Sequence, residues 1–536
     1  MTATDASHRL ARRSAAVGTG TLVSRLTGVV RVAITAAVLG QTVFADTYNA
    51  ANITPNILYE LLVGGILTAA LVPVFVDAYD ADDDTATSAV FTVAMTAVLL
   101  LTGIGVLLSP VISAAMSGRV PAGQHGEAEA VGTLLVALFL PQMVFYAYTA
   151  LATAALNARR RFTAAAFAPA LNNLVVIVVL LAIRASLPSC GTTRKGKVDE
   201  CLRYASHHPS VTWALGLGTT AGIAAMAIAL WPAMRRSGLR IRFKPEWRHP
   251  AVVRMARMSG WTVGYVIANQ FAFAFVLWLS RNEKGVFSDY TYAYAFFQLP
   301  HGLIAVSIMT ALAPALATAA RTHDFPVLRR QYELGMRYLL VAIIPAEALL
   351  LFFARPVIDA VLQYGSFASS AAGDTAKALV GFSVGLVPFS LYLYTLRAFY
   401  SMSDARTPFI VNCIENAANI AFAIILYPSG GVRGLALSFA LAYTLAAVIA
   451  LVLLYRRLGG FPTAPAVGLT ARAVAAAAVA VVIAVVVRHG VGGGLAGTVL
   501  AIASGGAAYV GALWCLRTGE LRGLASAVRG SGTPRV

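Results

Sequence analysis

Charge is scarce in this sequence. Only 12% of the 536 residues are charged, whereas 58% are hydrophobic. A soluble chain of this length needs far more polar surface. The apolar residues also gather in runs of about twenty, which is long enough to cross a hydrocarbon core roughly 30 Å thick. The composition therefore excludes a soluble globular protein and predicts an all-α protein with many membrane-spanning helices.

Acidic residues are scarcer than basic ones. The chain has 23 Asp and Glu against 41 Lys and Arg, a net charge of +18. No RNA-reading motif or basic repeat accompanies this charge, and membrane proteins carry an excess of Lys and Arg in their cytoplasmic loops. We therefore expect no nucleic-acid partner. The basic start of the chain is not typical of a cleaved signal peptide, because the apolar segment behind it is long and contains two arginines.

Cysteine is also rare, and the four residues present are too few for a disulfide scaffold. Cys413 and Cys515 fall in or beside apolar segments, where cysteine acts as a small hydrophobic residue. Cys190 and Cys201 share one hydrophilic loop that we expect outside the membrane. A disulfide between them and a pair of free thiols both remain open.

Catalytic and cofactor motifs are missing from the sequence. The histidines have no metal-ligand spacing, and there is neither a P-loop nor a G-x-S-x-G motif. We therefore predict a protein that is not an enzyme and has no bound cofactor. Without a nucleotide-binding loop, ATP bound to this chain cannot drive transport.

About fourteen spanning segments are predicted from the apolar runs, among them 48–76, 408–427 and 433–455. If the N-terminus is inside, the basic connections fall inside as well, among them 157–162 (NARRRF), 233–256 and 455–460 (YRRLGG). Both termini of this multi-pass protein then lie in the cytoplasm. Two loops deviate: 185–210 has four basic residues outside, and 77–84 is acidic inside. Neither overturns the orientation, because acidic residues have little weight in this rule.

The sequence contains an internal repeat. Pro141 and Pro388 lie in similar segments 247 residues apart, and at the same spacing Asn157-Ala158-Arg159 matches Asp404-Ala405-Arg406, Phe162 matches Phe409 and Asn172 matches Asn419. A looser echo joins 70–75 (ALVPVF) to 311–317 (ALAPALA). Both copies begin inside and span six helices, so we predict two parallel, pseudo-symmetric six-helix lobes.

These patterns divide the chain into four predicted parts. They are a first lobe at 1–232, a basic cytoplasmic linker at 233–256, a second lobe at 257–460, and two further helices with a cytoplasmic tail at 461–536.

Two arginines interrupt the first apolar segment. Arg25 and Arg31, in SRLTGVVR, lie near the middle of a predicted helix, where an arginine costs about 2.5–3.5 kcal/mol on insertion scales. They are about 9 Å apart along the helix axis, with the bare backbone of Gly28 between them. Guanidinium groups match phosphate oxygens bidentately, so the pair predicts an anion site. The alternative is an ion pair with Asp46 or Glu60 on the second segment.

The second segment carries a polar stripe. Its polar residues recur at spacings of three or four and so share one helical face: Asp46, Asn49, Asn52, Asn56 and Glu60. Pro55 and Gly64-Gly65 loosen the backbone, which is typical of a helix beside a water-filled cavity. Hydrogen bonding between helices is an equal alternative for the asparagines. In the eighth segment, Gln298, Pro300 and His301 are expected to break the helix.

Several blocks occur in the order typical of a known family: SRLTGVVR, ITPNIL, GGILTAALVPVF, LPQMVFYAYTALATAALNARRRF, QLPHGLIAVSIMTALAPALA and LRAFYSMSDARTPF. In these blocks the chain resembles the MurJ (MviN) lipid II flippases of the MOP superfamily, which also contains the MATE exporters. The resemblance implies two six-helix lobes around a central cavity plus two C-terminal helices.

The resemblance also implies a function. Members move the lipid-linked peptidoglycan precursor, lipid II, from the inner to the outer leaflet of the bacterial cytoplasmic membrane, a step in cell-wall synthesis and cell shape. The expected partners are lipid II, membrane lipid and cell-wall or division proteins, the last through the basic loop 233–256. A coupling ion, H⁺ or Na⁺, is left open, with Asp46 and Glu60 as its candidate residues.

The family pattern assigns site residues one by one. S-R-x-x-G-x-x-R falls on Ser24, Arg25, Gly28 and Arg31, the acidic residue that opens the second helix on Asp46, and the P-N pair on Pro55 and Asn56. This chain departs from the pattern where it has Tyr59 and Ala295 in place of arginine and Val32 in place of Asp. Substrate binding is therefore expected mainly from Arg25 and Arg31, together with Ser24 and Asn56, and with Tyr59 and Gln298 as neutral hydrogen-bonding residues. The residues expected to allow conformational change are Gly28, Pro55, Gly64, Gly65 and Pro300.

Two other functions fit parts of the pattern. One is a flippase for another polyprenyl-linked glycan or a MATE-like cation-coupled exporter, although an exporter of organic cations should have an acidic, aromatic cavity. The other is a membrane glycosyltransferase, which needs a metal-binding acidic loop or a large outer loop, and the predicted outside loops are too small for it.

Overall fold

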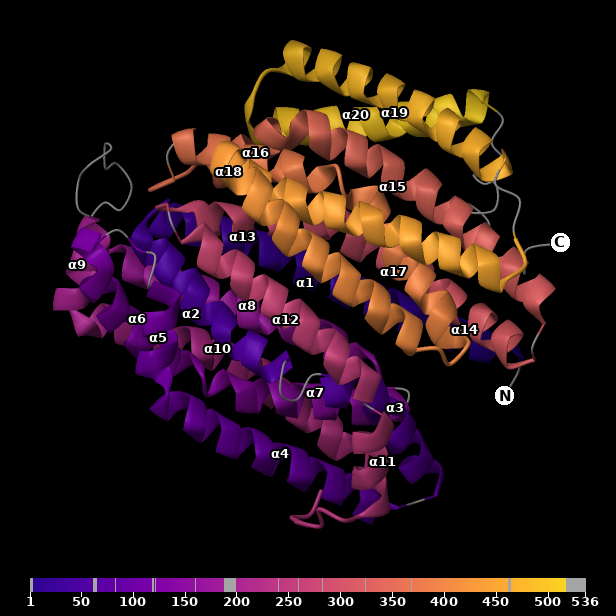
Figure 1. Ribbon diagram of the computed structural model, residues 1–536, viewed down its shortest axis with the longest axis horizontal. Coiled ribbons are helices and arrows are strands. Elements are labelled where there is room, and N and C mark those ends of the chain that lie inside the picture. The colour runs from indigo at the N-terminus through magenta and orange to yellow at the C-terminus, as the bar shows by residue number, and fades with distance from the viewer. Residues whose placement is uncertain are drawn as a thin grey trace. The chain divides into compact units, whose positions relative to one another are not determined.

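A computed structural model describes most of the chain (Figure 1). The described residues are 3–60, 65–81, 83–117, 120, 122–159, 161–187, 199–239, 241–258, 260–281, 283–322, 324–367, 369–460 and 464–516. Every regular element within these ranges is a helix. The expected all-α fold class is therefore confirmed.

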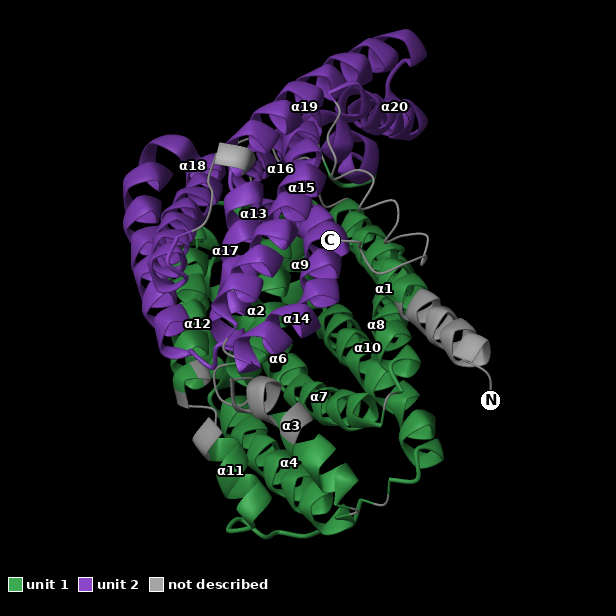
Figure 2. Cartoon of the chain, turned by 90° about the vertical axis from the view of Figure 1, so that its right-hand side faces the viewer, with its two compact units in different colours: residues 1–288, 364–368 green, residues 289–363, 369–536 purple. Residues whose placement is uncertain are grey.

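The chain divides into two compact units (Figure 2). The first consists of Met1–Ser288 and Tyr364–Ala368, and the second of Asp289–Gln363 and Ser369–Val536. The boundaries predicted for the two lobes and the linker stay predictions.

The first unit contains twelve α-helices within the described ranges. They are α1 (Ala3–Leu39), α2 (Val43–Tyr59), α3 (Gly65–Asp80), α4 (Asp84–Leu107), α5 (Ser109–Ser117), α6 (His125–Phe139), α7 (Gln142–Ala158), α8 (Thr163–Arg184), α9 (Glu200–His207), α10 (Pro209–Arg236), α11 (Pro250–Met258) and α12 (Gly260–Ser280). Helix α8 packs against α1 and α10, α2 packs against α6, and α3 packs against α7. One continuous apolar core, which includes Phe44, Phe139 and Leu151, joins these helices.

The second unit is built from the helices that follow. They are α13 (Val286–Pro300, which begins in the first unit), a π-helical turn (His301–Ala305), α14 (Val306–Arg321), α15 (Phe325–Leu362), α16 (Ser369–Ser383), α17 (Leu386–Ser401), α18 (Arg406–Arg457), α19 (Ala464–Val491) and α20 (Gly494–Cys515). Helix α18 packs against α16 and α17, and α19 packs against α15 and α20. Rings of Phe297, Phe382, Phe389 and Phe439 fill the interior with centroids 5.3–5.6 Å apart.

Local sequence signals set several helix ends. Gly40, with φ 66°, ends α1 in a conformation that favours glycine. The Thr42 hydroxyl accepts a hydrogen bond from the Ala45 N–H and so caps α2. Asp83 and Asp324 cap α4 and α15 in the same way, by accepting N–H groups of the first turn. Short polar residues before apolar runs therefore fix where these helices begin.

The two predicted spans 408–427 and 433–455 form one long element, α18. Gly431 interrupts its helical geometry with φ 52° and ψ −137°, three residues after Pro428. The backbone folds so closely here that a Cβ on Gly434 would lie 2.2 Å from the Leu426 carbonyl oxygen. Helix α18 is therefore two apolar segments joined at a glycine kink.

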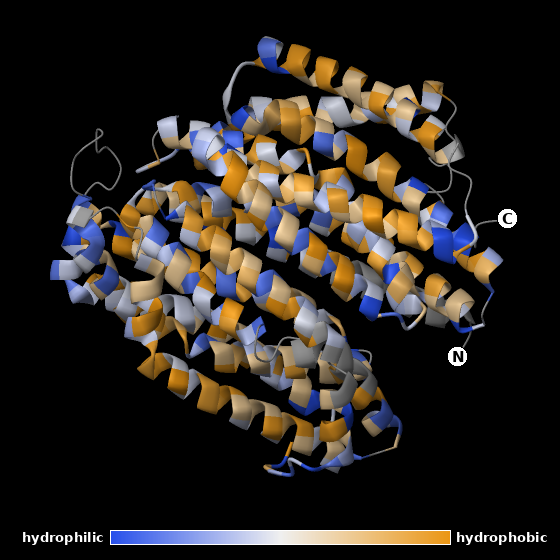
Figure 3. Cartoon of the chain, viewed as in Figure 1, coloured by the Kyte–Doolittle hydropathy of each residue, from blue (hydrophilic) through white to orange (hydrophobic). Residues whose placement is uncertain are grey.

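Eleven of the described helices, some of them joined end to end, are long and apolar enough to cross a membrane, or twelve if the pair α16 and α17, bent by 46°, forms one span. The predicted count of about fourteen is not confirmed. Within the predicted span 48–76, the structure describes α2 up to Tyr59 and α3 from Gly65, while 61–64 lie outside the described residues. Figure 3 shows hydrophobic residues along most helices and hydrophilic ones on the short helix α9.

The expected break at Pro300 is not an interruption of the helix. The backbone remains helical through Pro300 and then widens into the π-helical turn His301–Ala305 before α14 begins. A π-turn re-forms the hydrogen bonds that proline removes, which explains why the helix continues.

The matched asparagines of the internal repeat occupy similar environments in their own units. Asn172 and Asn419 are both buried, with exposed fractions of 8% and 7%. The Asn172 Oδ1 lies beside Gly222 of α10, and the Asn419 Oδ1 accepts a hydrogen bond from Ser438 Oγ at 3.0 Å. Each amide therefore contacts a later helical segment of the same unit at a position occupied by a small residue.

The cysteines separate into two kinds. Cys201, at the start of α9, is disulfide-bonded. Cys413 and Cys515 are free thiols. Cys190 lies outside the described residues, so its pairing with Cys201 stays a prediction.

Candidate functional site in the first unit

Helix α1 carries both predicted arginines. The Arg25 side chain is exposed and the Arg31 side chain is half-buried. The helix is held by α8, because Asn173 Nδ2 donates hydrogen bonds of 3.1 Å to the Ser24 carbonyl and to Thr27 Oγ1. Gly28 leaves room for this contact, since a Cβ there would lie 3.6 Å from Asn173 Nδ2. Ser24 and Gly28 therefore position the helix between the two arginines.

Neither arginine has an acidic partner in the part of the chain that the structure describes. Within the described ranges, no carboxylate lies within ion-pair distance of Arg25 or Arg31. The alternative that Asp46 or Glu60 pairs with them is therefore not found in the structure. Glu60 is half-buried directly after α2. A charge near the middle of an apolar helix without a counter-charge is typical of a substrate or ion pathway.

Two tyrosines interact with the Arg31 charge. The guanidinium interacts electrostatically with the hydroxyls of Tyr48 and Tyr146. The ring of Tyr146 contacts the ring of Tyr59, with centroids 6.0 Å apart. Tyr48 in turn shares a 3.0 Å hydrogen bond with Thr219 Oγ1. We call Tyr48, Tyr59 and Tyr146 the tyrosine cluster.

The tyrosine cluster contains one residue predicted from the sequence, Tyr59, and two that no sequence pattern indicates, Tyr48 and Tyr146. Tyr59 was expected as a neutral hydrogen-bonding residue, and the structure brings it to the same group of side chains as Arg31. Tyr48 and Tyr146 were not singled out, because tyrosines inside apolar segments are common in membrane helices. The internal repeat does not point to Tyr48 or Tyr146 either.

Asp46 binds backbone and hydroxyl groups rather than the arginines of α1. Its Oδ1 accepts the Ser288 N–H at 2.9 Å and the Ser288 hydroxyl at 2.6 Å, and its Oδ2 accepts the Gly285 N–H at 2.7 Å. The carboxylate thus caps the N-terminus of α13, where negative charge is favourable. Gly285, with φ 81°, lets the backbone turn toward it.

A buried arginine accompanies this cap. Arg281 is 3% exposed and interacts electrostatically with Asp46, while its Nη2 lies 3.4 Å from Thr47 Oγ1. Its Nε and Nη1 make no hydrogen bond within the described residues. The interaction between Asp46 and Arg281 is thus electrostatic, and the two described side chains form no direct ion pair. A coupling role for Asp46 stays a prediction.

The remaining predicted residues of α2 lie at its C-terminal end. Pro55 is buried and Asn56 is exposed. The Glu60 N–H bonds to the carbonyls of Asn56 and Ile57 and so closes the helix. Gly65 begins α3, whereas Gly64 lies outside the described residues.

Gln298 belongs to the second unit. Its Nε2 donates a hydrogen bond to the Tyr294 hydroxyl. Three residues further on, His301 Nδ1 lies 3.0 Å from Ser390 Oγ, and its ring contacts Phe389. The predicted role of Gln298 as a substrate-binding residue stays a prediction. Within the described residues, no group of three or more His, Cys, Asp or Glu side chains is arranged to hold a metal ion.

Long apolar helices in two units, with helix-embedded arginines free of acidic partners in the described part of the chain, define a multi-pass membrane protein of the transporter class. Comparison with known proteins agrees. The solved structure of lipid II flippase MurJ in an inward closed conformation superposes with a TM-score of 0.72 at 19% identity, covering 93% of this chain and 98% of that one. An inward-facing MATE family multidrug transporter of the MOP superfamily gives 0.62 at 15% identity, covering 82% and 98%.

Sequence relatives point to the same family. A probable lipid II flippase MurJ from Rhizobium meliloti is 29% identical over 80% of this chain and 77% of its own. The lipid II flippase MurJ of Burkholderia cenocepacia is 28% identical over 72% of each chain. The model of the family Lipid II flippase MurJ matches residues 35–503. The chain belongs to this family.

Proposed function

We infer that the protein is a flippase that moves lipid II from the inner to the outer leaflet of the cytoplasmic membrane for peptidoglycan synthesis. Membership of the family supports this function. The observation that carries the substrate chemistry is the pair Arg25 and Arg31, which lack carboxylate partners among the described residues. Lipid II carries a diphosphate, and guanidinium groups bind phosphate oxygens bidentately.

The arginines and the tyrosine cluster bind different parts of lipid II. Arg31, half-buried, holds the diphosphate more tightly than exposed Arg25, because a charge is screened less away from water. Arg25 extends the positive charge along α1 toward the rest of the anion. The hydroxyls of Tyr59 and Tyr146 donate neutral hydrogen bonds to sugar or phosphate oxygens. At one position where the family pattern has a further arginine, this chain has Tyr59.

Transport follows alternating access. The head group enters a site open to the cytoplasm and leaves when the site opens outside, while the polyprenyl tail stays in lipid. Moving negative charge outward is favoured by an inside-negative potential, by about 2.3 kcal/mol per charge per 100 mV. No covalent bond forms or breaks, so the protein acts as a carrier and not as an enzyme. If an ion is coupled, half-buried Glu60 is the acid best placed to respond to it.

Depletion of the protein tests this function. The expected result is accumulation of lipid-linked precursor in the inner leaflet, measured by its protection from an externally added reagent that modifies the exposed head group. Re-expression of wild type or Arg31→Lys restores outer-leaflet precursor, fully or partly, whereas Arg31→Ala at equal abundance does not. Arg236→Gln, an exposed arginine at the end of α10, is the matched control. An unchanged leaflet distribution after depletion, in cells without another flippase, contradicts the function.

A further inference from the structure

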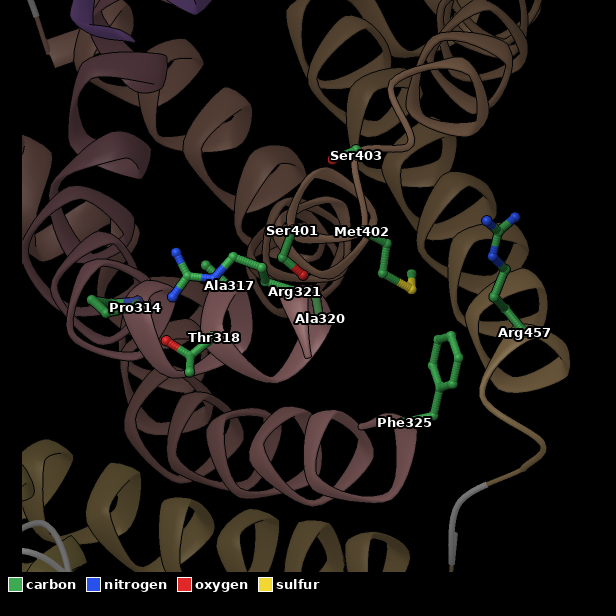
Figure 4. A pocket seen from close by; sticks show the side chains of 10 residues that line it. All are labelled: Pro314, Ala317, Thr318, Ala320, Arg321, Phe325, Ser401, Met402, Ser403 and Arg457. Carbon is green, nitrogen blue, oxygen red and sulfur yellow. The ribbon is translucent and has the colours of Figure 1, made fainter. Parts of the chain in front are cut away.

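The second unit contains an open cavity at the ends of four helices. Its volume is about 820 Å³, and it is lined by Pro314, Ala317, Thr318, Ala320, Arg321, Phe325, Ser401, Met402, Ser403 and Arg457. Figure 4 shows the Met402 and Phe325 side chains in the space between the side chains of Arg321 and Arg457. The lining thus combines two cations and three hydroxyl groups with the apolar side chains of Phe325 and Met402.

The cavity keeps an uncompensated positive charge. Arg457 pairs with Asp404 at 3.4 Å. Arg321 has no carboxylate within ion-pair distance in the described part of the chain. The nearest acid in sequence, Asp324, uses Oδ1 to cap its own helix at the Val327 N–H. An anion that enters the cavity therefore meets one free guanidinium and one that is shared.

The first unit has the corresponding site, and it is filled. The ends of α3 and α7 and the start of α4 there enclose about 10 Å³, with Phe75, Tyr79, Arg159 and Leu239 among the lining residues. The Tyr79 ring lies 5.1 Å from the Arg159 guanidinium, which also pairs with Asp84 at 3.7 Å. Aromatic and acidic side chains of the first unit therefore occupy the space and neutralise its arginine.

Alignment of the two repeats explains the difference. When Pro73 is placed on Pro314 and the capping residue Asp83 on Asp324, Tyr79 falls on Ala320, Asp80 on Arg321 and Asp84 on Phe325. Tyr79, whose ring fills the first site, is thus replaced in the second site by Ala320, whose side chain is only a methyl group. Two acids are replaced, one by an arginine and one by an aromatic ring. Both the open volume and the positive charge of the cavity trace to these three positions.

We propose that this cavity binds the phosphate of an anionic lipid head group from the cytoplasmic leaflet. The basic loops around it are those that the charge pattern places inside, and basic pockets at this side of membrane proteins bind anionic head groups. Arg321 and Arg457 take the phosphate, while Phe325 and Met402 contact the glycerol and the first acyl carbons. This binding is separate from transport of lipid II. A soluble phosphate has the same charged group but lacks the apolar part.

Lipid binding to the purified full chain tests the proposal. In neutral detergent, phosphatidylglycerol is titrated and the bound lipids are counted by native mass spectrometry. We expect Arg321→Gln to weaken the tightest site about fivefold, the effect of one basic residue near a membrane surface. Ala320→Tyr, which restores the ring found in the first unit, should weaken it at least as much. Arg330→Gln, an exposed arginine at the same end of α15, is the matched control.

Two further titrations identify the ligand. Phosphatidylcholine and inorganic phosphate are titrated in parallel, and both should bind the wild type at least about fivefold more weakly than phosphatidylglycerol. Equal binding of phosphatidylcholine, or no loss in Arg321→Gln, overturns the proposal. If millimolar inorganic phosphate displaces all bound phosphatidylglycerol, the ligand is a soluble phosphate and the lipid assignment is wrong. Circular dichroism verifies that Ala320→Tyr is folded. If Ala320→Tyr does not fold, the lipid affinity of Arg321→Gln alone tests the proposal.

Discussion

Asp46 accepts hydrogen bonds from both the backbone N–H and the hydroxyl of Ser288. The two residues lie 242 positions apart in the sequence. Through this contact a carboxylate of α2 caps the start of α13, and it also interacts electrostatically with buried Arg281.

Replacement of Asp46 by Asn is expected to destabilise the protein. Asn has one acceptor oxygen where Asp46 uses two, so hydrogen bonds from Gly285 and Ser288 are lost, and the electrostatic interaction with buried Arg281 is lost with the charge. Losing hydrogen bonds to a charged, buried group lowers the free energy of unfolding by about 3 kcal/mol. We expect the midpoint of thermal unfolding in detergent to fall by roughly 3–6 °C.

A double variant separates the charge from the cap. Asp46→Asn combined with Arg281→Gln removes both charges, so its loss should be smaller than the sum of the two single losses. Asp80→Asn, at an exposed acid, is the control and should leave the midpoint unchanged. Additive losses would show that Arg281 does not depend on Asp46.

The two arginines of α1 should differ in their effect on substrate binding. Arg31 is half-buried beside the tyrosine cluster, whereas Arg25 is exposed. We expect Arg31→Ala to weaken binding of a diphosphate lipid about tenfold or more, and Arg25→Ala only a few-fold, since buried charges interact more strongly. Titration of lipid II into purified variants measures this order. The reverse order would place the anion nearer to Arg25.

Gly434 should not tolerate a side chain. A Cβ there would lie 2.2 Å from the Leu426 carbonyl oxygen and 2.6 Å from its carbon, and backbone atoms cannot move aside as a side-chain tip can. Gly434→Ala is expected to lower the free energy of unfolding by about 1–3 kcal/mol. Gly430→Ala is the matched control, because nothing lies within 4 Å of a Cβ there. Equal unfolding midpoints for the two variants would contradict the tight kink in α18.

The numbers of free and disulfide-bonded cysteines in the folded protein can be measured directly. Cys413 and Cys515 are free, and Cys201 is disulfide-bonded. A maleimide added to unfolded, unreduced protein should therefore label two thiols, and four after reduction, as read by mass. Four labels before reduction would show that the loop cysteines are free thiols. A disulfide here agrees with an oxidising compartment outside the membrane.

The sequence predicted the elements that depend on local pattern. The apolar runs indicated the helices. Two arginines in the middle of one run indicated an anion site, because a charge inside the membrane costs free energy unless it faces water, a counter-charge or a ligand. Each of these signals lies within a few turns of one helix.

Contacts between distant segments could not be predicted in this way. Asp46 was grouped with the polar stripe of α2, but its partners are Ser288, Gly285 and Arg281, and nothing near Asp46 in the sequence points to them. Tyr146 lies in an apolar run where a tyrosine has no distinguishing neighbour. The predicted count of about fourteen spans is not confirmed, and apolar length alone does not show the kink that joins 408–427 to 433–455 in α18.

The separation of Asp46 from Ser288 matters while the chain is being made. Ribosomes add roughly 5–20 residues per second, so the 242 residues between them take about 12–48 s to synthesise. During that interval the nascent second helix holds an acid whose eventual partners do not yet exist. Insertion into the bilayer must therefore begin with a carboxylate that is either hydrated at the surface or protonated, until the later helices arrive.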